Sequence, residues 1–552
     1  MKKYVSGAIC ALLMLVSVCA SAQNTVKGSV TDKNGEIIPG AMVLDTDNGK
    51  WSVSDIDGRF SIDNAAKGHT FEVTCLGYTT KSVVYQGEAS LTIVLEDDSL
   101  ELEETVVIGY GSVKKKDLTG SVGVLDSKII EQQSVTNLSQ SLQGSVPGLQ
   151  VTRSSSMPGA SATLQIRGVT TMSDNSPLLI VDGMTVSSID NISTADVEQI
   201  TVLKDGAASS IYGSRAAAGV ILITTKGAKE GDLHIAYNGE YTMIGATEWA
   251  EYLTDPINYM TMFNEYKWND AGNGEGGDYQ TYPKEYIENY FAMNAQDPIE
   301  YPNFDWKDNI VKNFASLHRH TLTASYGNKV IKTRVSGSYE NTDALYKGSD
   351  YHRILARVKN TINISKRLSA DIDCSFKHAI KTNTQTVPLQ AANMYPSIYL
   401  GLYPDGRTAP GKSGSNTLGI VNEGGTSSSC NDFVTGKIAL SYKPIDGLDL
   451  TASYAPTFSF TKSKDWVRAV PYYDAYDTDI VLGYLSGHQI NSLTETRKNT
   501  NTHEFQAVAT YERQIANAHN LSVMAGYEVF YGYTESMSGS SSGMTLSDFP
   551  YL

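Results

Sequence analysis

The sequence predicts a mainly β protein, and its composition and hydropathy pattern together lead to that prediction. Tyr, with 33 residues, outnumbers Phe (13) and Trp (5) together, 47 residues are Gly, and only 19% are charged. So many aromatic residues exclude a disordered chain. In the second half, apolar and polar residues alternate with a period of two, as strands with two different faces require. After the N-terminus no apolar run approaches the ~20 residues of a membrane-spanning helix, which excludes a helical membrane protein.

Residues 1–22 are predicted to be a signal peptide. Lys2 and Lys3 precede a mostly apolar stretch over residues 5–18, and small residues follow at positions 20–22. We therefore expect an exported protein whose mature chain begins at Gln23. The formal net charge of −16 argues against a nucleic-acid partner.

The mature chain keeps three cysteines, Cys75, Cys374 and Cys430, whose wide separation gives neither a disulfide framework nor the spacing of metal ligands. We expect each to pack as a small apolar side chain. The histidines show no H-E-x-x-H spacing, which a zinc peptidase would need. The sequence therefore predicts no catalytic residue, no metal and no cofactor.

Residues 23–97 are predicted to form a β-sandwich of about seven short strands. Asn34-Gly35 and Asp57-Gly58 are hairpin-turn signals. Asp55 and Asp57 could also be read as calcium ligands, but a role in the turn is favoured. The pattern G-x-V-x-D-x-x-G-x-x-x-P-G-A, followed by S-D-x-D-G-x-F-x-I and then L-G-Y, resembles the carboxypeptidase-regulatory-like domain. That module carries no chemistry of its own.

Residues 98–117 are predicted to be a linker. It starts with acidic residues and ends with three lysines, and the β-branched run TVVIGYG lies between them at residues 105–111. With no neighbouring hairpin signal, this run is predicted to be an unpaired strand, which can add its backbone to the exposed sheet edge of another protein. A strand of the preceding sandwich is an equal alternative.

Residues 118–230 show a mixed αβ pattern. A helical period covers residues 129–142 and ends at Gly144. Residues 195–202 are predicted to be a helix entering a strand. Further strands are predicted at residues 149–152, 164–166, 178–181 and 219–225.

Several strings of this segment resemble the plug of TonB-dependent outer-membrane transporters: GSVPGLQV, LQIRGV, PLLIVDGM, DVEQITVLKD and AASSIYGSRAAAGVILITTKG. The string TVVIGYGSVKKKDLTGSV is similar to the SusC/RagA branch of that family, and the resemblance covers the whole mature chain. It implies a TonB box at Glu104, Thr105, Val106, Val107, Ile108, Gly109, Tyr110 and Gly111. The plug motifs contain Arg167, Gly168, Asp182, Gly183, Lys204, Asp205, Tyr212, Gly213 and Arg215. By the resemblance, Arg167 and Arg215 are expected to face acidic groups on the barrel, although capping of plug turns is as good an interpretation.

Residues 231–552 are predicted to form part of a transmembrane antiparallel β-barrel. About nine strands alternate between short turns and mostly long loops, so the long loops share one rim, as in outer-membrane barrels. Plugged transporters have ~22 strands, and nine are too few to enclose a plug. We therefore expect an incomplete barrel, an open curved sheet partly wrapping the plug. We also expect the chain to be a fragment of a longer one or the product of a truncated gene.

Two motif matches are expected to be fortuitous. Residues 406–413 fit the phosphate-binding formula G-x-x-x-x-G-K-S, but the glycines and polar residues that follow are not expected to sustain the helix it needs. Residues 539–543 fit the nucleophile elbow G-x-S-x-G inside a Ser/Gly tract, without the strand-turn-helix context.

The resemblance implies TonB-dependent import of oligosaccharides or oligopeptides across the outer membrane, with the N-terminal domain in the periplasm. The implied partners are TonB with its inner-membrane motor, a SusD-like lipoprotein and outer-membrane lipid. A loop could stack cargo on Trp466, Tyr472, Tyr473, Tyr476 and Tyr484, although girdle or loop packing is as good an interpretation. A surface binding or adhesion protein without transport is the alternative. A transporter that also signals would need a further periplasmic domain before the plug, for which the sequence leaves no room.

Overall fold

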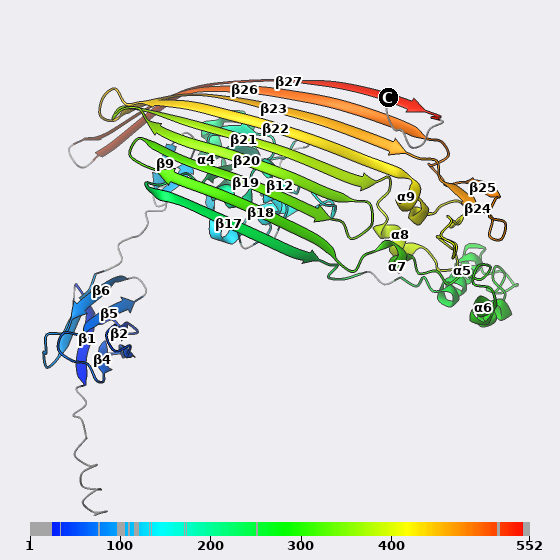
Figure 1. Ribbon diagram of the computed structural model, residues 1–552, viewed down its shortest axis with the longest axis horizontal. Coiled ribbons are helices and arrows are strands. Elements are labelled where there is room, and N and C mark those ends of the chain that lie inside the picture. Colours follow the sequence, from blue (N-terminus) through cyan, green and yellow to red (C-terminus); the bar gives the residue numbers. More distant parts are fainter. Residues whose placement is uncertain are drawn as a thin grey trace, which may run out of the picture. The chain divides into compact units, whose positions relative to one another are not determined.

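The computed structural model describes most of the chain, and the described residues fall into two compact units (Figure 1). The predicted signal peptide, most of the linker and the C-terminal residues 545–552 lie outside the description. The described residues are 25–33, 35–75, 78–96, 105–108, 111–114, 121–131, 133, 135–169, 172, 174–249, 252–515 and 519–544.

The N-terminal unit is the predicted sandwich of seven strands. One sheet has the order β4-β1-β7 and the other β3-β2-β5-β6. Alternate residues of β1 are buried, so its apolar face packs into a core shared by both sheets. The bounds are β1 (Val26–Asp32), β2 (Met42–Asp45), β3 (Trp51–Val53), β4 (Arg59–Ile62), β5 (Thr70–Cys75), β6 (Tyr78–Val84) and β7 (Leu91–Leu95).

Asp55 stabilises a turn of this sandwich. Its Oδ1 accepts hydrogen bonds from the backbone N–H groups of Asp57 and Arg59, and Gly58 takes the positive φ of 70° that the turn requires. These hydrogen bonds explain Asp55 as a residue that stabilises the turn, which is the role the sequence favours over calcium binding.

Residues 105–108 of the predicted run form a strand, but this strand is paired. β8 (Thr105–Ile108) and β9 (Gly111–Lys114) make a two-stranded sheet of their own. The expectation of an unpaired strand is therefore wrong, and so is the alternative of a strand belonging to the sandwich. The physical reason is that an extended β-branched strand gains backbone hydrogen bonds from the extended segment directly after it.

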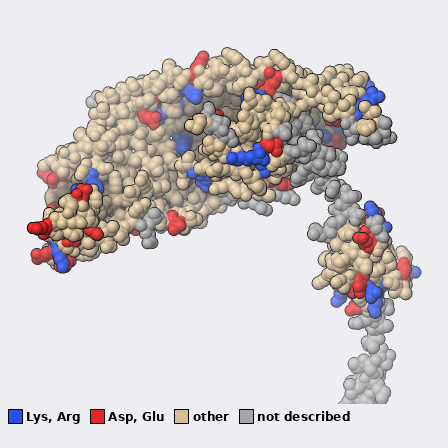
Figure 2. Space-filling model, turned by 180° about the vertical axis from the view of Figure 1, so that it is seen from behind, with Lys and Arg blue, Asp and Glu red and all other residues tan. Residues whose placement is uncertain are grey.

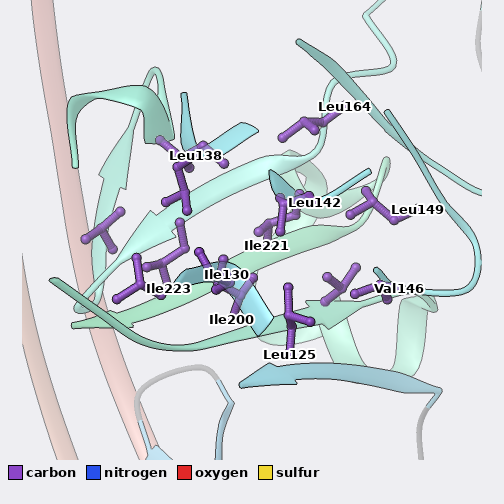
Figure 3. Close-up of a cluster of buried hydrophobic side chains, with 14 of the residues drawn as sticks. Leu125, Ile130, Leu138, Leu142, Val146, Leu149, Leu164, Ile200, Ile221 and Ile223 are labelled. Atoms are coloured by element: carbon purple, nitrogen blue, oxygen red, sulfur yellow. The ribbon is translucent and has the colours of Figure 1, made fainter. Parts of the chain in front are cut away.

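The αβ segment of residues 121–226, called the plug from here on, is built on a five-stranded sheet with the order β10-β15-β16-β13-β14. Its strands are β10 (Val122–Asp126), β13 (Leu178–Val181), β14 (Met184–Val186), β15 (Val197–Leu203) and β16 (Val220–Thr225), and β11 (Leu149–Thr152) pairs with β12 (Thr163–Ile166) beside them. Short helices connect them: α2 (Ser127–Glu131), α3 (Leu138–Ser141), η2 (Ile189–Asn191), η3 (Thr194–Asp196), α4 (Gly206–Ser209) and η4 (Ser210–Ala216). Figure 3 shows the buried aliphatic side chains that fill its interior, among them Ile130, Ile200 and Ile221.

One plug prediction fails. The helix expected over residues 129–142 is two short helices, α2 and α3, with an extended Asn137 before the second. The backbone carbonyls of Val135 and Thr136 accept hydrogen bonds from arginines of the neighbouring sheet, so they are not available for a continuous helix.

The remaining strands form one nine-stranded antiparallel sheet, called the wall from here on (Figure 1). They are β17 (Gly231–Ile244), β18 (Ala315–Gly327), β19 (Ile331–Asp343), β20 (Asp350–Asn363), β21 (Leu368–Thr384), β22 (Gly425–Tyr442), β23 (Leu448–Val467), β26 (Ser492–Ile515) and β27 (His519–Ser542). Each pairs with its neighbour in chain order, and within the described residues β17 and β27 are the two open edges. The predicted strand number and the alternation of short and long connections are confirmed.

The two faces of the wall differ, as β21 illustrates. Asp373 and Ala379 are buried on the face that meets the plug, whereas Cys374 and Phe376 are exposed on the other face. The exposed face is apolar along neighbouring strands too, with Ile354, Ile438, Leu440 and Phe505 among its exposed side chains. This exposed side is called the outer face below.

Several wall strands are longer than predicted. The apolar-polar alternation predicts long loops over residues 381–432 and 461–501. In the structure, β22 already begins at Gly425, β23 continues to Val467 and β26 begins at Ser492. These strand ends are rich in Ser, Thr and Asn on both faces, so they carry no apolar-polar alternation for a sequence argument to detect. The backbone ladder with neighbouring strands nevertheless continues through them.

The long loops carry short elements: α5 (Pro256–Asp270), α6 (Lys284–Gln296), α7 (Trp306–Ile310), α8 (Leu389–Met394), α9 (Thr417–Glu423), β24 (Pro471–Tyr473) and β25 (Val481–Tyr484). Acidic side chains gather at the end of the sheet that bears α5 and α6 (Figure 2, left). Among the described residues, none of the helices combines the length and the apolar character that crossing a membrane requires.

Candidate functional site

The contact between plug and wall is the candidate functional site, and the turn at Asp182 and Gly183 is its centre. Both residues have positive φ, 47° and 81°, which a two-residue hairpin turn between β13 and β14 requires and which Asp and Gly tolerate. The Asp182 carboxylate accepts from Arg357 Nη2 at 2.6 Å and from Lys359 Nζ at 3.3 Å, both on β20 of the wall. Within the plug, the N–H and the hydroxyl of Thr225 donate to it as well. Two wall cations thus hold the carboxylate of the turn.

The charge of Asp182 depends on these cations. Burial by itself would raise the pKa of this carboxyl, but Lys359 and Arg357 outweigh burial and hold its pKa below the usual range. Arg357 is shared, because its guanidinium also pairs with Asp373 on β21. Lys437 on β22 donates to the backbone carbonyl of Asp182. Asp182 is therefore an ionised, buried group that contacts three wall strands directly or through Arg357.

A second contact holds the break between α2 and α3. Arg353 Nη2 donates to the carbonyl of Thr136 at 2.5 Å, and Arg319 donates to the carbonyl of Val135. Both arginines are almost fully buried, and both pair with one Glu340 carboxylate oxygen, at 3.1 and 2.8 Å. Both guanidinium groups therefore pair with a carboxylate of the wall and also donate to the plug backbone.

Hydrogen bonds and ion pairs make up further plug–wall contacts, beside the ring of Tyr351, which packs against Gly159. The plug's buried apolar clusters consist of plug residues alone in the part of the chain that the structure describes. Water can replace polar contacts at small net cost, whereas an apolar interface would have to be exposed. The further contacts are Asp196 with Arg334 and Ser336, Thr185 with Glu504, Gly183 with Gln506, Asn191 with Lys377, and Arg215 with Glu528.

The plug-motif residues are distributed over several places. Arg215 pairs with Glu528 on β27, whereas Arg167 is exposed at a turn after β12, has a φ of 58° and makes no ion pair among the described residues. Lys204 and Asp205 directly follow β15, and the Asp205 carboxylate accepts from the N–H of Ser121. The remaining motif residues shape the plug itself: Gly168 and Gly213 have positive φ, and Tyr212 is buried.

Sequence reasoning missed the wall side of this site. Arg353, Arg357 and Lys359 lie on one face of β20, at spacings of four and two residues, and Glu340 lies on the same face of β19. The detectable signal is charge at alternate positions on strands whose other face is apolar. Their plug partners lie more than a hundred residues earlier in the chain, which no local pattern reveals.

The predicted TonB box is only partly described. Thr105, Val106, Val107 and Ile108 form β8, and Gly111 begins β9. Glu104, Gly109 and Tyr110 lie outside the described residues.

The five predicted cargo-stacking aromatics do not form one loop surface. Trp466 is buried and belongs to β23, so placing it in a loop is wrong. Tyr472 and Tyr473 lie on β24, and Tyr484, half exposed, lies opposite on β25. Tyr476 donates to Asp297 at 2.7 Å, and this hydrogen bond raises the pKa of Tyr476 to about 12.

The two motif matches lack their required surroundings. Residues 539–542 lie within β27, so no nucleophile elbow forms there. At residues 406–413 the absence of a following helix is wrongly predicted, because α9 begins at Thr417. Its first turn is capped by the side chain of Asn416, which accepts from the N–H of Gly419. No strand directly precedes the match among the described residues, so the strand-loop-helix geometry that binds phosphate is missing.

Two family models match the chain. Residues 114–220 match the TonB-dependent Receptor Plug Domain, and residues 26–107 match the CarboxypepD_reg-like domain.

Curated relatives match over most of the chain. TonB-dependent receptor P3 of Formosa agariphila is 28% identical over 542 residues, covering 95% of this chain and 50% of the relative. TonB-dependent receptor SusC of Bacteroides thetaiotaomicron is 31% identical over 364 residues, covering 63% of this chain and 33% of the relative. The chain spans about half the length of the first of these relatives and a third of the second.

Among solved structures, the RagAB peptide importer in the closed-closed state matches with a TM-score of 0.63 and 21% identity. The match covers 78% of this chain and 50% of that one. At this identity the likeness shows the fold: a plug beside an antiparallel sheet.

Proposed function

The chain belongs to the SusC/RagA family of TonB-dependent receptors, and from that premise we propose that it serves in active import across the outer membrane. The observation that carries the proposal is the set of polar plug–wall contacts around Asp182, Val135 and Thr136, called the seat of the plug from here on. A plug that must leave and return needs contacts that water can replace reversibly. An apolar seat of the same size would resist displacement.

Energy for this step has to come through a protein contact, because the outer membrane has neither a nucleotide supply nor a lasting ion gradient. We place that contact at residues 104–111, where Val106, Val107 and Ile108 add as a strand to TonB. The strand β8 is already extended and already paired with β9. When β8 exchanges β9 for TonB, it gains new backbone hydrogen bonds in place of those it loses, and water can bond the released groups of β9, so the net cost of the exchange is small.

TonB, driven by its inner-membrane motor, then pulls the plug through its N-terminal end. The wall cations that held Asp182 and the carbonyls of Val135 and Thr136 become hydrated and line the opening. The N-terminal sandwich lies in the periplasm in this scheme, and the apolar outer face of the wall contacts outer-membrane lipid.

The cargo is an oligosaccharide or an oligopeptide, delivered with a SusD-like lipoprotein that acts as a lid. Support for the peptide comes from the RagAB structures, which are described as a peptide importer. Support for the sugar comes from Tyr472, Tyr473, Tyr476 and Tyr484, whose rings lie on and between β24 and β25 in a long loop. Enzymatic activity plays no part in the proposal.

One experiment tests the proposal against the adhesion alternative. Growth of a deletion strain on a panel of glycans and peptides identifies the cargo, and the strain is then complemented with Val107→Pro. Proline removes a backbone donor and fixes φ, so strand addition fails. We expect surface binding without uptake. Normal uptake by the Val107→Pro strain would contradict the assignment of the TonB box. If the deletion strain grows and binds on every glycan and peptide as the parent strain does, import itself is contradicted.

A further inference from the structure

Three side chains of types that bind metals meet on the outer face of the wall, away from the plug. His378 on β21 lies directly opposite Asp432 on β22, and Cys430 is two residues before Asp432 on the same face. His378 Nδ1 is 2.6 Å from Asp432 Oδ1, and Cys430 Sγ is 3.9 Å from both His378 Nδ1 and Asp432 Oδ2. The neighbouring residues Lys377 and Phe433 point the other way, toward the plug.

We propose that His378, Cys430 and Asp432 bind one Zn²⁺ ion. Imidazole nitrogen, thiolate and carboxylate are the three ligand types that zinc takes in proteins. Bonds of roughly 2.0–2.3 Å in a tetrahedron place ligand atoms ~3.3–3.8 Å apart, close to the two distances from Cys430. Zinc replaces the direct His378–Asp432 hydrogen bond, so these two atoms move apart by about 1 Å. All three side chains are partly exposed. They lie where the outer face of β22 changes from the apolar Val434 and Ile438 to the polar Ser428 and Thr426, toward the long-loop end of the strand, so water can take the fourth position.

Charge and rigidity favour the same assignment. A thiolate and a carboxylate together balance the charge of Zn²⁺. The ligands stand on two hydrogen-bonded strands, so their spacing is fixed by the sheet before metal binds. Zinc there joins β21 to β22 below the long loop of residues 385–424, which carries α8 and α9.

A similar group in the N-terminal unit carries no such inference. Asp45, Asp47 and His69 also lie close together, but the carboxylates there already accept from backbone N–H groups. They complete a turn, as Asp55 does in the same sandwich.

The test uses Co²⁺ as a spectroscopic probe for zinc in the full 552-residue chain, purified in detergent. We expect one equivalent of Co²⁺ to bind with a thiolate-to-cobalt charge-transfer band, and Zn²⁺ to displace it. Cys430→Ser should abolish the band, and His378→Ala or Asp432→Asn should weaken Co²⁺ binding at least tenfold. The matched control is Cys374→Ser, since Cys374 is an exposed thiol on the same face of β21 and should be dispensable.

A second measurement keeps all three ligands, so it does not depend on whether the ligand variants fold. In a chain whose other cysteines are serine, Zn²⁺ should slow the reaction of Cys430 with a thiol reagent at least tenfold. The proposal is overturned if Co²⁺ gives no charge-transfer band, if Zn²⁺ leaves the thiol reaction unchanged, or if Cys374→Ser removes the band as completely as Cys430→Ser.

Discussion

Replacing Asp182 by Asn should loosen the plug without changing its shape. The amide is isosteric with the carboxylate and can still accept from Thr225, but it no longer balances Lys359 and Arg357. The side chain of Asp182 is 12% exposed and that of Arg357 is 9% exposed, so the pair is buried. The change therefore leaves buried positive charge on the wall with less compensation than before.

The free energy lost in Asp182→Asn depends on the contacts that Arg357 and Lys359 retain. Breaking a buried ion pair from one side costs about 3–5 kcal/mol. Arg357 retains Asp373, and Lys359 retains two weaker contacts to Thr225, so the lower end applies. A loss of about 3 kcal/mol corresponds to roughly two powers of ten in the population of plugs released from this contact.

Hydrogen–deuterium exchange measures that population. Amides of β13 and β14, on either side of Asp182, should exchange up to about 100-fold faster in Asp182→Asn wherever exchange requires release from the wall. The control is Asp174→Asn, an exposed plug carboxylate whose contact is local, to Ser176. Exchange of β13 and β14 within about threefold of the unsubstituted chain would refute the assignment of Asp182 as the centre of the seat.

Further predictions concern other parts of the molecule. Val107→Pro should abolish uptake while membrane insertion and surface binding persist, as measured by labelled-cargo accumulation. Because the pKa of Asp182 lies below its ordinary value of 3.8, its ionised form stabilises the seat above that pH and the stability is lost as the pH falls through the lowered value. Exchange protection of β13 and β14 should therefore decrease below about pH 4 in the unsubstituted chain but not in Asp182→Asn. Joint replacement of Arg167 and Arg215 by Ala should raise antibiotic leak only slightly, since the partly exposed ion pair of Arg215 contributes about 0.2–1 kcal/mol; unchanged permeability with normal expression would contradict this. Trp466→Ala should lower the melting temperature through a loss of about 3–5 kcal/mol, and an unshifted melting curve would contradict its burial.

The sequence predicted the architecture because local chemistry determines most of it. The alternation along β21 and the short turns at residues 328–330 and 364–367 are local signals, and they determined strand number and order. The prediction of the strand ends failed because it also relied on local signals, and Ser, Thr and Asn on both faces of β22 and β26 leave no alternation to detect.

The contacts of the seat could not be predicted from the sequence, because they join residues far apart in the chain. Arg353 contacts Thr136, which lies 217 residues away, and only the fold brings them together. The same contact explains why the helix predicted over residues 129–142 is broken: helix propensity is a weak preference, and two buried guanidinium groups outweigh it. The plug-side motif at Asp182 and Gly183 could be found, because a hairpin turn has its own local signal.

The position of β10 in the plug sheet has a mechanical consequence. Among the described residues, β10 is an edge strand that pairs only with β15, over the five pairs from Val122–Leu203 to Asp126–Gln199, and it is the first strand of the plug sheet in chain order. Force applied from that side loads this one strand before any other, and its removal leaves the order β15-β16-β13-β14 intact. The plug can therefore lengthen by one strand under tension and re-anneal that strand on the same template when tension ends. Each cycle of the proposed import then begins from the same state without refolding the whole domain.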